Sequence, residues 1–107
     1  MTGRSIAAIG AALLVGALGP AAALARQNAD AGRYVAANCA NCHGTLGIAK
    51  GAMPSLAGLK REYIVEQMRA FRDGKRPATL MHQLAKGYTD PQIEAVAEFF
   101  ARQPAAR

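Results

Sequence analysis

Apolar side chains recur at helical spacing in three stretches of the chain, and no part of the sequence is typical of a strand. The first stretch covers residues 28–38, the second covers residues 60–73, and the third begins at Thr89 or Asp90 and ends near Gln103. The apolar stripes are Ala31, Tyr34 and Val35; Ile64, Met68 and Phe71; and Ile93, Val96, Ala97 and Phe100. The pattern therefore predicts an all-α domain with three main helices.

Residues able to cap a helix precede the first and the last stretch. Asn28 or Asp30 can accept hydrogen bonds from the free N–H groups of the first helix. In the last helix, Asp90 as the cap would put Pro91 at the first helical position. Thr89 as the cap would instead form a capping box with the glutamine three residues later. The sequence leaves both choices open at each helix.

Glycine and proline separate the predicted helices. Residues 44–58 contain four glycines and a proline, and residues 74–82 form a second loop that starts with a glycine. Residues 84–88 form a short turn, helical at most. A long loop in a small domain usually encloses something. Gly32 lies inside the first helix, where it costs about 1 kcal/mol relative to alanine, so we expect another helix to approach it closely.

The end of the first helix is followed by Cys39, Cys42 and His43, which form a C-x-x-C-H motif. This is the pattern of c-type haem attachment. Two thiols three positions apart can each form a thioether with one vinyl group of the same haem. The adjacent histidine can then supply a proximal imidazole nitrogen to the iron. The motif predicts one covalent haem c.

The same residues allow two other kinds of site. Cys39 and Cys42 are the only cysteines and could form a disulfide or a redox-active thiol pair, although a thioredoxin-like motif expects a βαβ setting. A zinc site needs about four N/S ligands. The chain offers only these two cysteines with His43 and His82, and adjacent Cys42 and His43 would close a tetrahedron badly. Haem attachment is the favoured interpretation.

The N-terminus has the three parts of a secretory signal peptide. Arg4 precedes an apolar run at residues 6–18, and an A-x-A cleavage site ends at Ala25. We therefore expect residues 1–25 to be a cleaved signal peptide and residues 26–107 to be one mono-haem domain. The alternative is an uncleaved membrane anchor, but the run is short for a span of about 20 residues.

Four side chains could bind the second face of the iron: Met53, Met68, Met81 and His82. Met53 lies ten residues after His43, which places it on the same side of the haem. Met68 lies on the apolar stripe of a helix, where methionine usually fills the core. Met81 lies far along the chain in a loop and can reach the distal face. Met81 is therefore the predicted distal ligand, with His82 as its rival.

The formal net charge is +6, and it falls to about +5 if Arg4 is removed with the signal. No basic run is interleaved with aromatic residues, which argues against a nucleic-acid partner. A basic surface instead suits an acidic protein partner. Lys75 and Arg76, just before the predicted distal ligand, could pair with haem propionates or with such a partner, or could simply be solvated.

From about Asp30 to Phe100 the sequence resembles a class I cytochrome c. Its attachment motif and Met81 match the family's haem site. The segment Pro54-Ser55-Leu56-Ala57-Gly58 matches the family's P-x-L-x-G, in which the proline carbonyl accepts a hydrogen bond from the axial histidine. Gly32 and the Phe99/Phe100 pair match the contact between the first and last helices. The resemblance implies three main helices and loops wrapped around one covalent haem.

A closer likeness is to the haem subunit of flavocytochrome c sulfide dehydrogenases. It is carried by residues 51–58, by residues 76–81 and by residues 84–90. The sequence departs from the family pattern where His82 directly follows the predicted ligand. In that family a separate FAD-bearing subunit oxidises sulfide and passes electrons to the cytochrome. The resemblance implies a periplasmic carrier of single electrons with no catalytic residue of its own. The alternatives are a free-standing shuttle between respiratory complexes, and a haem sensor or peroxidase with an open iron site.

Overall fold

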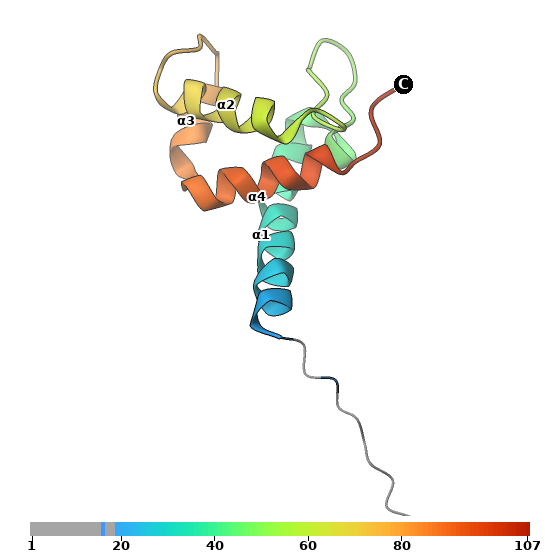
Figure 1. The fold of residues 1–107 in the computed structure, drawn as a ribbon. Helices are drawn as coiled ribbons and strands as arrows, with labels where there is room; N and C mark the ends of the chain where they lie inside the picture. The colour runs from blue at the N-terminus through green and yellow to red at the C-terminus, as the bar shows by residue number, and fades with distance from the viewer. Residues whose placement is uncertain (1–15, 17–18) are drawn as a thin grey trace, which may run out of the picture.

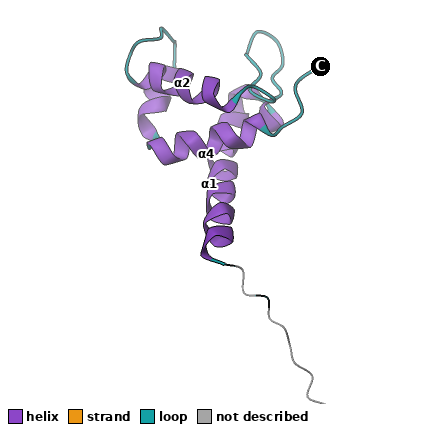
Figure 2. Cartoon of the chain, in the orientation of Figure 1, coloured by secondary structure: helices purple, strands orange, loops and turns teal. Residues whose placement is uncertain are grey.

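The computed structural model describes residue 16 and residues 19–107 (Figure 1). Its helices in chain order are α1 (Pro20–His43), α2 (Arg61–Arg72), α3 (Met81–Leu84) and α4 (Asp90–Ala101), with 3₁₀ turns at Thr45–Gly47 and Ala85–Gly87. Figure 2 shows only helices and loops in this part of the chain, without a strand. The predicted all-α class with three main helices is confirmed.

Helix α4 is the central element, because it packs against both α1 and α2 (Figure 1). The four residues predicted for its apolar stripe are all buried: Ile93, Val96, Ala97 and Phe100. They meet Val35 and Ala36 of α1 and a stripe of α2 in one core cluster. Burying a side chain of the size of Ile93 or Phe100 stabilises the fold by about 1.5–3 kcal/mol.

Gly32 lies at the crossing of α1 and α4, as its position inside a helix predicted. A Cβ atom there would stand 2.4 Å from the carbonyl oxygen of Ala95 and 3.3 Å from Cβ of Phe99. The first of these atoms belongs to backbone and cannot move aside. Only glycine therefore allows α4 to come this close to α1.

Helix α1 is longer than predicted at both ends. It begins at Pro20, because proline suits the first helical position and an alanine-rich run follows it. It continues through the C-x-x-C-H motif and ends only at Gly44, which has φ 82°. The predicted stripe was also wrong at Tyr34, which is 78% exposed, since the contact at Gly32 turns a different face toward α4.

The other helix boundaries agree with the sequence to within a residue or two. The cap of α4 is Thr89, whose hydroxyl accepts from the N–H of Gln92 while the Gln92 side chain accepts from the N–H of Thr89. Of the two possible caps, Thr89 and Asp90, the structure uses Thr89, and the capping box is formed. Met81 was predicted in a loop, but it begins the short helix α3. No side chain caps α3, so the sequence carries no local signal for its start.

Arg4 and nearly all of the apolar run at residues 6–18 lie outside the described residues, and cleavage after Ala25 stays a prediction. Within the described part of the chain, no helix combines the length and the apolar character needed to cross a membrane.

Candidate haem site

The last turns of α1 present the attachment motif on one helix face. Cys39, Cys42 and His43 stand at i, i+3 and i+4, which are neighbouring positions on a helical surface. This arrangement exists because α1 runs on to Gly44 instead of ending before the motif. Both thiols are free. The motif therefore offers two sulfurs and one imidazole from a single rigid element.

The imidazole of His43 is held by one strong hydrogen bond. The side chain is only 8% exposed, and its Nδ1 lies 2.7 Å from the carbonyl oxygen of Pro54. This is the contact that the family resemblance implied. Because a carbonyl oxygen can only accept, Nδ1 carries the hydrogen of this bond, and in the neutral ring Nε2 is then the nitrogen with the free lone pair. The ring is thus fixed in the tautomer and orientation that a metal ligand needs.

The His43 loop, residues 44–60, is tied down by backbone hydrogen bonds. The carbonyl oxygen of Gly47 accepts from the N–H of Leu56 at 2.7 Å and from that of Ala57 at 3.1 Å. The N–H of Gly58 donates to the carbonyl oxygen of Phe100 at 2.9 Å. The two bonds to Gly47 hold the loop together on either side of Pro54, and the bond from Gly58 ties it to α4.

The two thiols have different surroundings. Cys42 is exposed, whereas Cys39 is partly buried and its Sγ donates to the carbonyl oxygen of Val35 at 3.4 Å. Burial raises the pKa of the Cys39 thiol. Cysteines of redox-active C-x-x-C pairs have a lowered pKa instead. The electrostatics of Cys39 therefore disfavour the thiol-redox alternative. Across residue 16 and residues 19–107, no group of three or more His, Cys, Asp or Glu side chains is placed to hold a metal ion.

The candidates for the distal ligand occupy different settings. Met68 is buried in the core, as predicted, and Met53 is 41% exposed in the His43 loop just before Pro54. Met81 is partly buried and packs against the core cluster that Cys39 also contacts. His82 is partly buried as well, and its Nδ1 is a buried atom without a hydrogen-bond partner. The structure thus brings Met81 and the motif to the same core.

These residues fit a covalent haem. A haem c needs two thiols and two axial ligands, and all four groups are present. Cys39 and Cys42 offer free thiols on the same helix face as His43, whose Nε2 is not used in the bond to Pro54, and Met81 offers a thioether from a distant segment. A shallow pocket of about 460 Å³ beside Cys42 includes Ile48 and Lys50 in its lining. The thiol of Cys42 is therefore accessible from the surface.

Comparison with known proteins decides the family. The family described as cytochrome c oxidase, cbb3-type, subunit III, matches residues 26–100, and the chain belongs to it. The chain is a c-type cytochrome. It binds one haem c covalently and functions in electron transfer.

Individual relatives support the same assignment for this cytochrome. The cytochrome subunit of sulfide dehydrogenase from Chlorobaculum tepidum is 39% identical over 84 residues, which cover 77% of this chain and 76% of the relative. The thiosulfate dehydrogenase electron acceptor of Stutzerimonas stutzeri is 42% identical over 67 residues, or 59% of this chain and 31% of that protein. The resemblance to the sulfide dehydrogenase haem subunit is confirmed as a sequence similarity.

A solved structure confirms the fold of the cytochrome. Acidithiobacillus ferrooxidans cytochrome c4 superposes with a TM-score of 0.66 at 34% sequence identity, over 69% of this chain and 49% of the matched one. The predicted class I cytochrome c fold is therefore correct.

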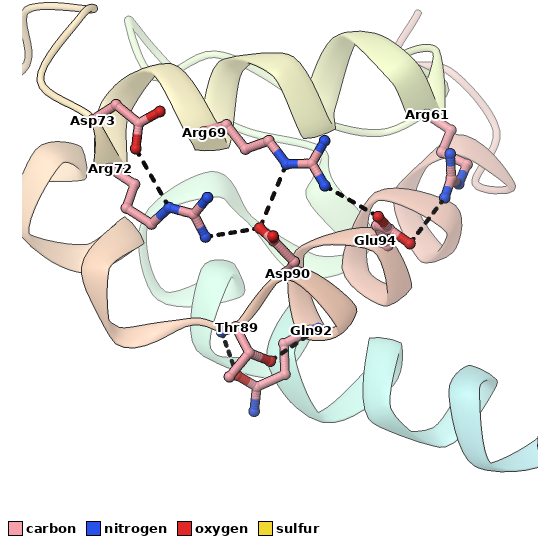
Figure 3. Close-up of polar contacts among 8 residues, drawn as sticks. All are labelled: Arg61, Arg69, Arg72, Asp73, Thr89, Asp90, Gln92 and Glu94. Carbon is pink, nitrogen blue, oxygen red and sulfur yellow. Dashed lines mark hydrogen bonds and ion pairs between the residues drawn. The ribbon is translucent and has the colours of Figure 1, made fainter.

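The sequence analysis missed a set of ion pairs between α2 and α4. Arg72 pairs with Asp90 at 2.8 Å, and Arg69 pairs with Glu94 at 3.1 Å (Figure 3). The full set joins Arg61, Arg69 and Arg72 of α2 to Asp90, Glu94 and Glu98 of α4. A signal was present, because the three acidic residues recur every four positions and so form one face of α4. A groove of about 710 Å³ along these charges contains no predicted site residue.

Proposed function

We propose that Cys39 and Cys42 hold the haem as thioethers and that His43 and Met81 are the two axial ligands of its iron. The hydrogen bond from His43 Nδ1 to the Pro54 carbonyl carries this proposal, since it orients the ring and, in the neutral imidazole, leaves Nε2 as the nitrogen that can bind a metal. The free state of both thiols and the place of Met81 at the same core support it.

The bound haem supplies a one-electron couple, and the residues around it set how readily that couple is reduced. Pro54 makes the imidazole of His43 a stronger donor by accepting its Nδ1 hydrogen. A neutral thioether from Met81 stabilises ferrous iron relative to a second imidazole. Ligation by Met81 therefore gives a higher reduction potential than ligation by His82.

The electron donor we propose is the FAD-containing subunit of a sulfide dehydrogenase. The relative from Chlorobaculum tepidum supports this choice, because the match covers about three quarters of both chains. Sulfide would then be oxidised on the flavoprotein, and this chain would only accept the electrons. The cytochrome is thus proposed to be the non-catalytic half of the oxidoreductase.

The charge distribution supports an acidic docking partner. Residues 44–60 and residues 74–89 contain no aspartate or glutamate. Both stretches carry basic residues: Lys50, Lys60, Lys75, Arg76 and Lys86. The acidic residues of α4 are instead engaged with arginines of α2. Positive charge is therefore left on the two stretches next to the proposed haem ligands His43 and Met81, where it would attract an acidic surface.

A free-standing shuttle is the second candidate. It is favoured by the similarity to the thiosulfate dehydrogenase electron acceptor of Stutzerimonas stutzeri, at 42% identity. A shuttle would use the same haem site but would form only transient complexes. Purification of the native cytochrome separates the two functions: a stable complex with a yellow flavoprotein that reduces the haem on addition of sulfide supports the first, and a monomer that the flavoprotein does not reduce contradicts it.

We place the protein in the periplasm, with residues 1–25 as the cleaved signal peptide. The family match begins at residue 26, directly after the proposed cleavage site, which supports this division. Cleavage would remove Pro20 and the first turns of α1. Asn28 or Asp30 would then be available to cap the shortened helix.

The visible spectrum of the haem-loaded protein tests the ligand set. We expect a low-spin spectrum with the weak long-wavelength iron–sulfur band, and we expect Met81→Ala to lose that band. Met53→Ala is the matched control, because it removes an exposed methionine from the other loop and should keep the band. A wild-type spectrum without the band, or rapid binding of carbon monoxide to the ferrous protein, would instead support His82 or an open iron site.

A further inference from the structure

Met81 lies in a segment whose two ends are joined by an ion pair. The Met81 segment, residues 73–89, connects the last residue of α2, Arg72, to the first residue of α4, Asp90. The Arg72 guanidinium lies 2.8 Å from Oδ1 of Asp90 (Figure 3). Around this contact, Arg69 reaches the same oxygen at 3.5 Å, and Asp73 lies 3.7 Å from Nε of Arg72. The pair therefore closes the segment at its base.

Little of the Met81 segment is buried. Ala85 is its only buried residue, and the helices that follow Met81 pack on α2. At its start, the N–H groups of Lys75 and Arg76 donate to the carbonyl oxygen of Ala70 in α2. Around Met81 the backbone hydrogen bonds are local, such as those from the N–H groups of Gln83 and Leu84 to the carbonyl oxygen of Leu80. A segment with so little buried surface opens at a lower free-energy cost than the core.

We propose that the Arg72–Asp90 pair positions Met81 for the iron by holding the two ends of its segment together. The inference rests on the proposed role of Met81 as the distal ligand. Joining the ends lowers the conformational entropy of the open segment, so fewer arrangements take Met81 away from the site. Asp90 also lies at the N-terminus of α4, where the helix dipole favours its negative charge. Arg72 and Asp90 are thus positioning residues.

Exogenous imidazole measures the opening of this segment. It can bind the iron only in molecules whose Met81 has left, so its apparent affinity is proportional to the open fraction. Titrations of the ferric, haem-loaded protein should compare wild type with Asp90→Asn. A second variant, Arg72→Gln, removes the other partner and leaves the Arg69–Asp90 contact in place.

The matched control is Glu98→Gln. It makes the same change of charge on the same helix and breaks pairs with Arg61 and Arg102 at the other end of α4, away from the Met81 segment. We expect Asp90→Asn and Arg72→Gln to tighten imidazole binding by about two- to fivefold, the range for an exposed ion pair. Glu98→Gln should leave it unchanged.

Met81→Ala separates failure of the ligand set from failure of this inference. If Met81→Ala does not tighten imidazole binding, Met81 is not the ligand and the positioning role falls with it. If Met81→Ala tightens binding but Asp90→Asn and Arg72→Gln do not, the ligand set stands and the positioning role alone is wrong. An equal effect of Glu98→Gln would also overturn it, because the response would then reflect general stability.

Discussion

The two segments next to the proposed haem ligands, residues 44–60 and residues 73–89, are held in different ways. The His43 loop is tied to α4 by the hydrogen bond from Gly58 to Phe100 and to α1 by the bond between His43 and the Pro54 carbonyl, and it contains buried Gly47 and Ala57. The Met81 segment buries only Ala85. Its first residues bond to α2, the turns around Met81 bond among themselves, and an exposed ion pair joins its two ends. The protein therefore packs the loop next to His43 into the fold and leaves Met81, the proposed distal ligand, on a segment with little buried surface.

The largest expected effect is on the His43 loop, from Gly47→Ala. Gly47 has φ 79°, and a Cβ there would lie 2.8 Å from the ring of Phe100 and 2.9 Å from the N of Ala57. Strain in the backbone and overpacking together should lower the free energy of unfolding by about 2–4 kcal/mol. Chemical denaturation of the haem-loaded protein measures this loss.

Gly51→Ala is the control for that variant. Gly51 also has a positive φ, of 68°, but a Cβ there would meet nothing within 4 Å. The free energy of unfolding of Gly51→Ala should fall only by the cost of the strained backbone, about 1–2 kcal/mol. Equal losses in the two variants would show that the packing of Gly47 against α4 does not hold the loop.

A smaller and more local effect is expected from Ala85→Val in the Met81 segment. Ala85 is fully buried, so two added methyl groups should cost about 1–3 kcal/mol. Because the segment can move away without unfolding the core, most of this cost should appear as a weaker iron–sulfur band. Gln83→Val places the same side chain at an exposed position and should keep the band. If Ala85→Val lowered the free energy of global unfolding by this amount and kept the iron–sulfur band, the Met81 segment would not open independently of the core.

The smallest effect is a pH dependence at the base of the Met81 segment. The hydrogen bond from Arg72 lowers the pKa of Asp90 below its ordinary value of 3.8. A lowered carboxyl pKa contributes stability that is complete above 3.8 and is lost as the pH falls through the folded-state value. Wild type should therefore be slightly more stable than Asp90→Asn at neutral pH, and thermal unfolding curves of the two should converge in acid. A gap that persists in acid would show that the Asp90 charge is not its source.

The parts that could be predicted from the sequence are those with local signals. The apolar stripe of α4 repeats at helical spacing, and its four residues are all buried. Gly32 is costly inside a helix, which indicated the crossing with α4. The attachment motif needs only five consecutive residues. The contact between His43 and Pro54 came from the family resemblance, because no periodicity relates a helix end to a loop proline.

The parts that could not be predicted depend on distant residues. The ion pairs between α2 and α4 require the two helices to be antiparallel neighbours, which residue spacing within one helix does not reveal. Helix α3 forms without a capping residue, so its packing on α2 and not its sequence makes Met81 helical. The end of α1 is different, because a local signal existed: the motif contains no helix-breaking residue before Gly44, so the prediction ended the helix too early.

Native-state hydrogen exchange of the haem-loaded protein tests the difference between the two segments most directly. The N–H groups of Leu56 and Ala57 report on the His43 loop, and those of Gln83 and Leu84 report on the Met81 segment. We predict that the first pair exchanges with the free energy of global unfolding. The second pair should exchange through local opening, faster by about tenfold or more. Equal protection of both pairs would show that the distal ligand is held as firmly as the proximal one and would contradict the account.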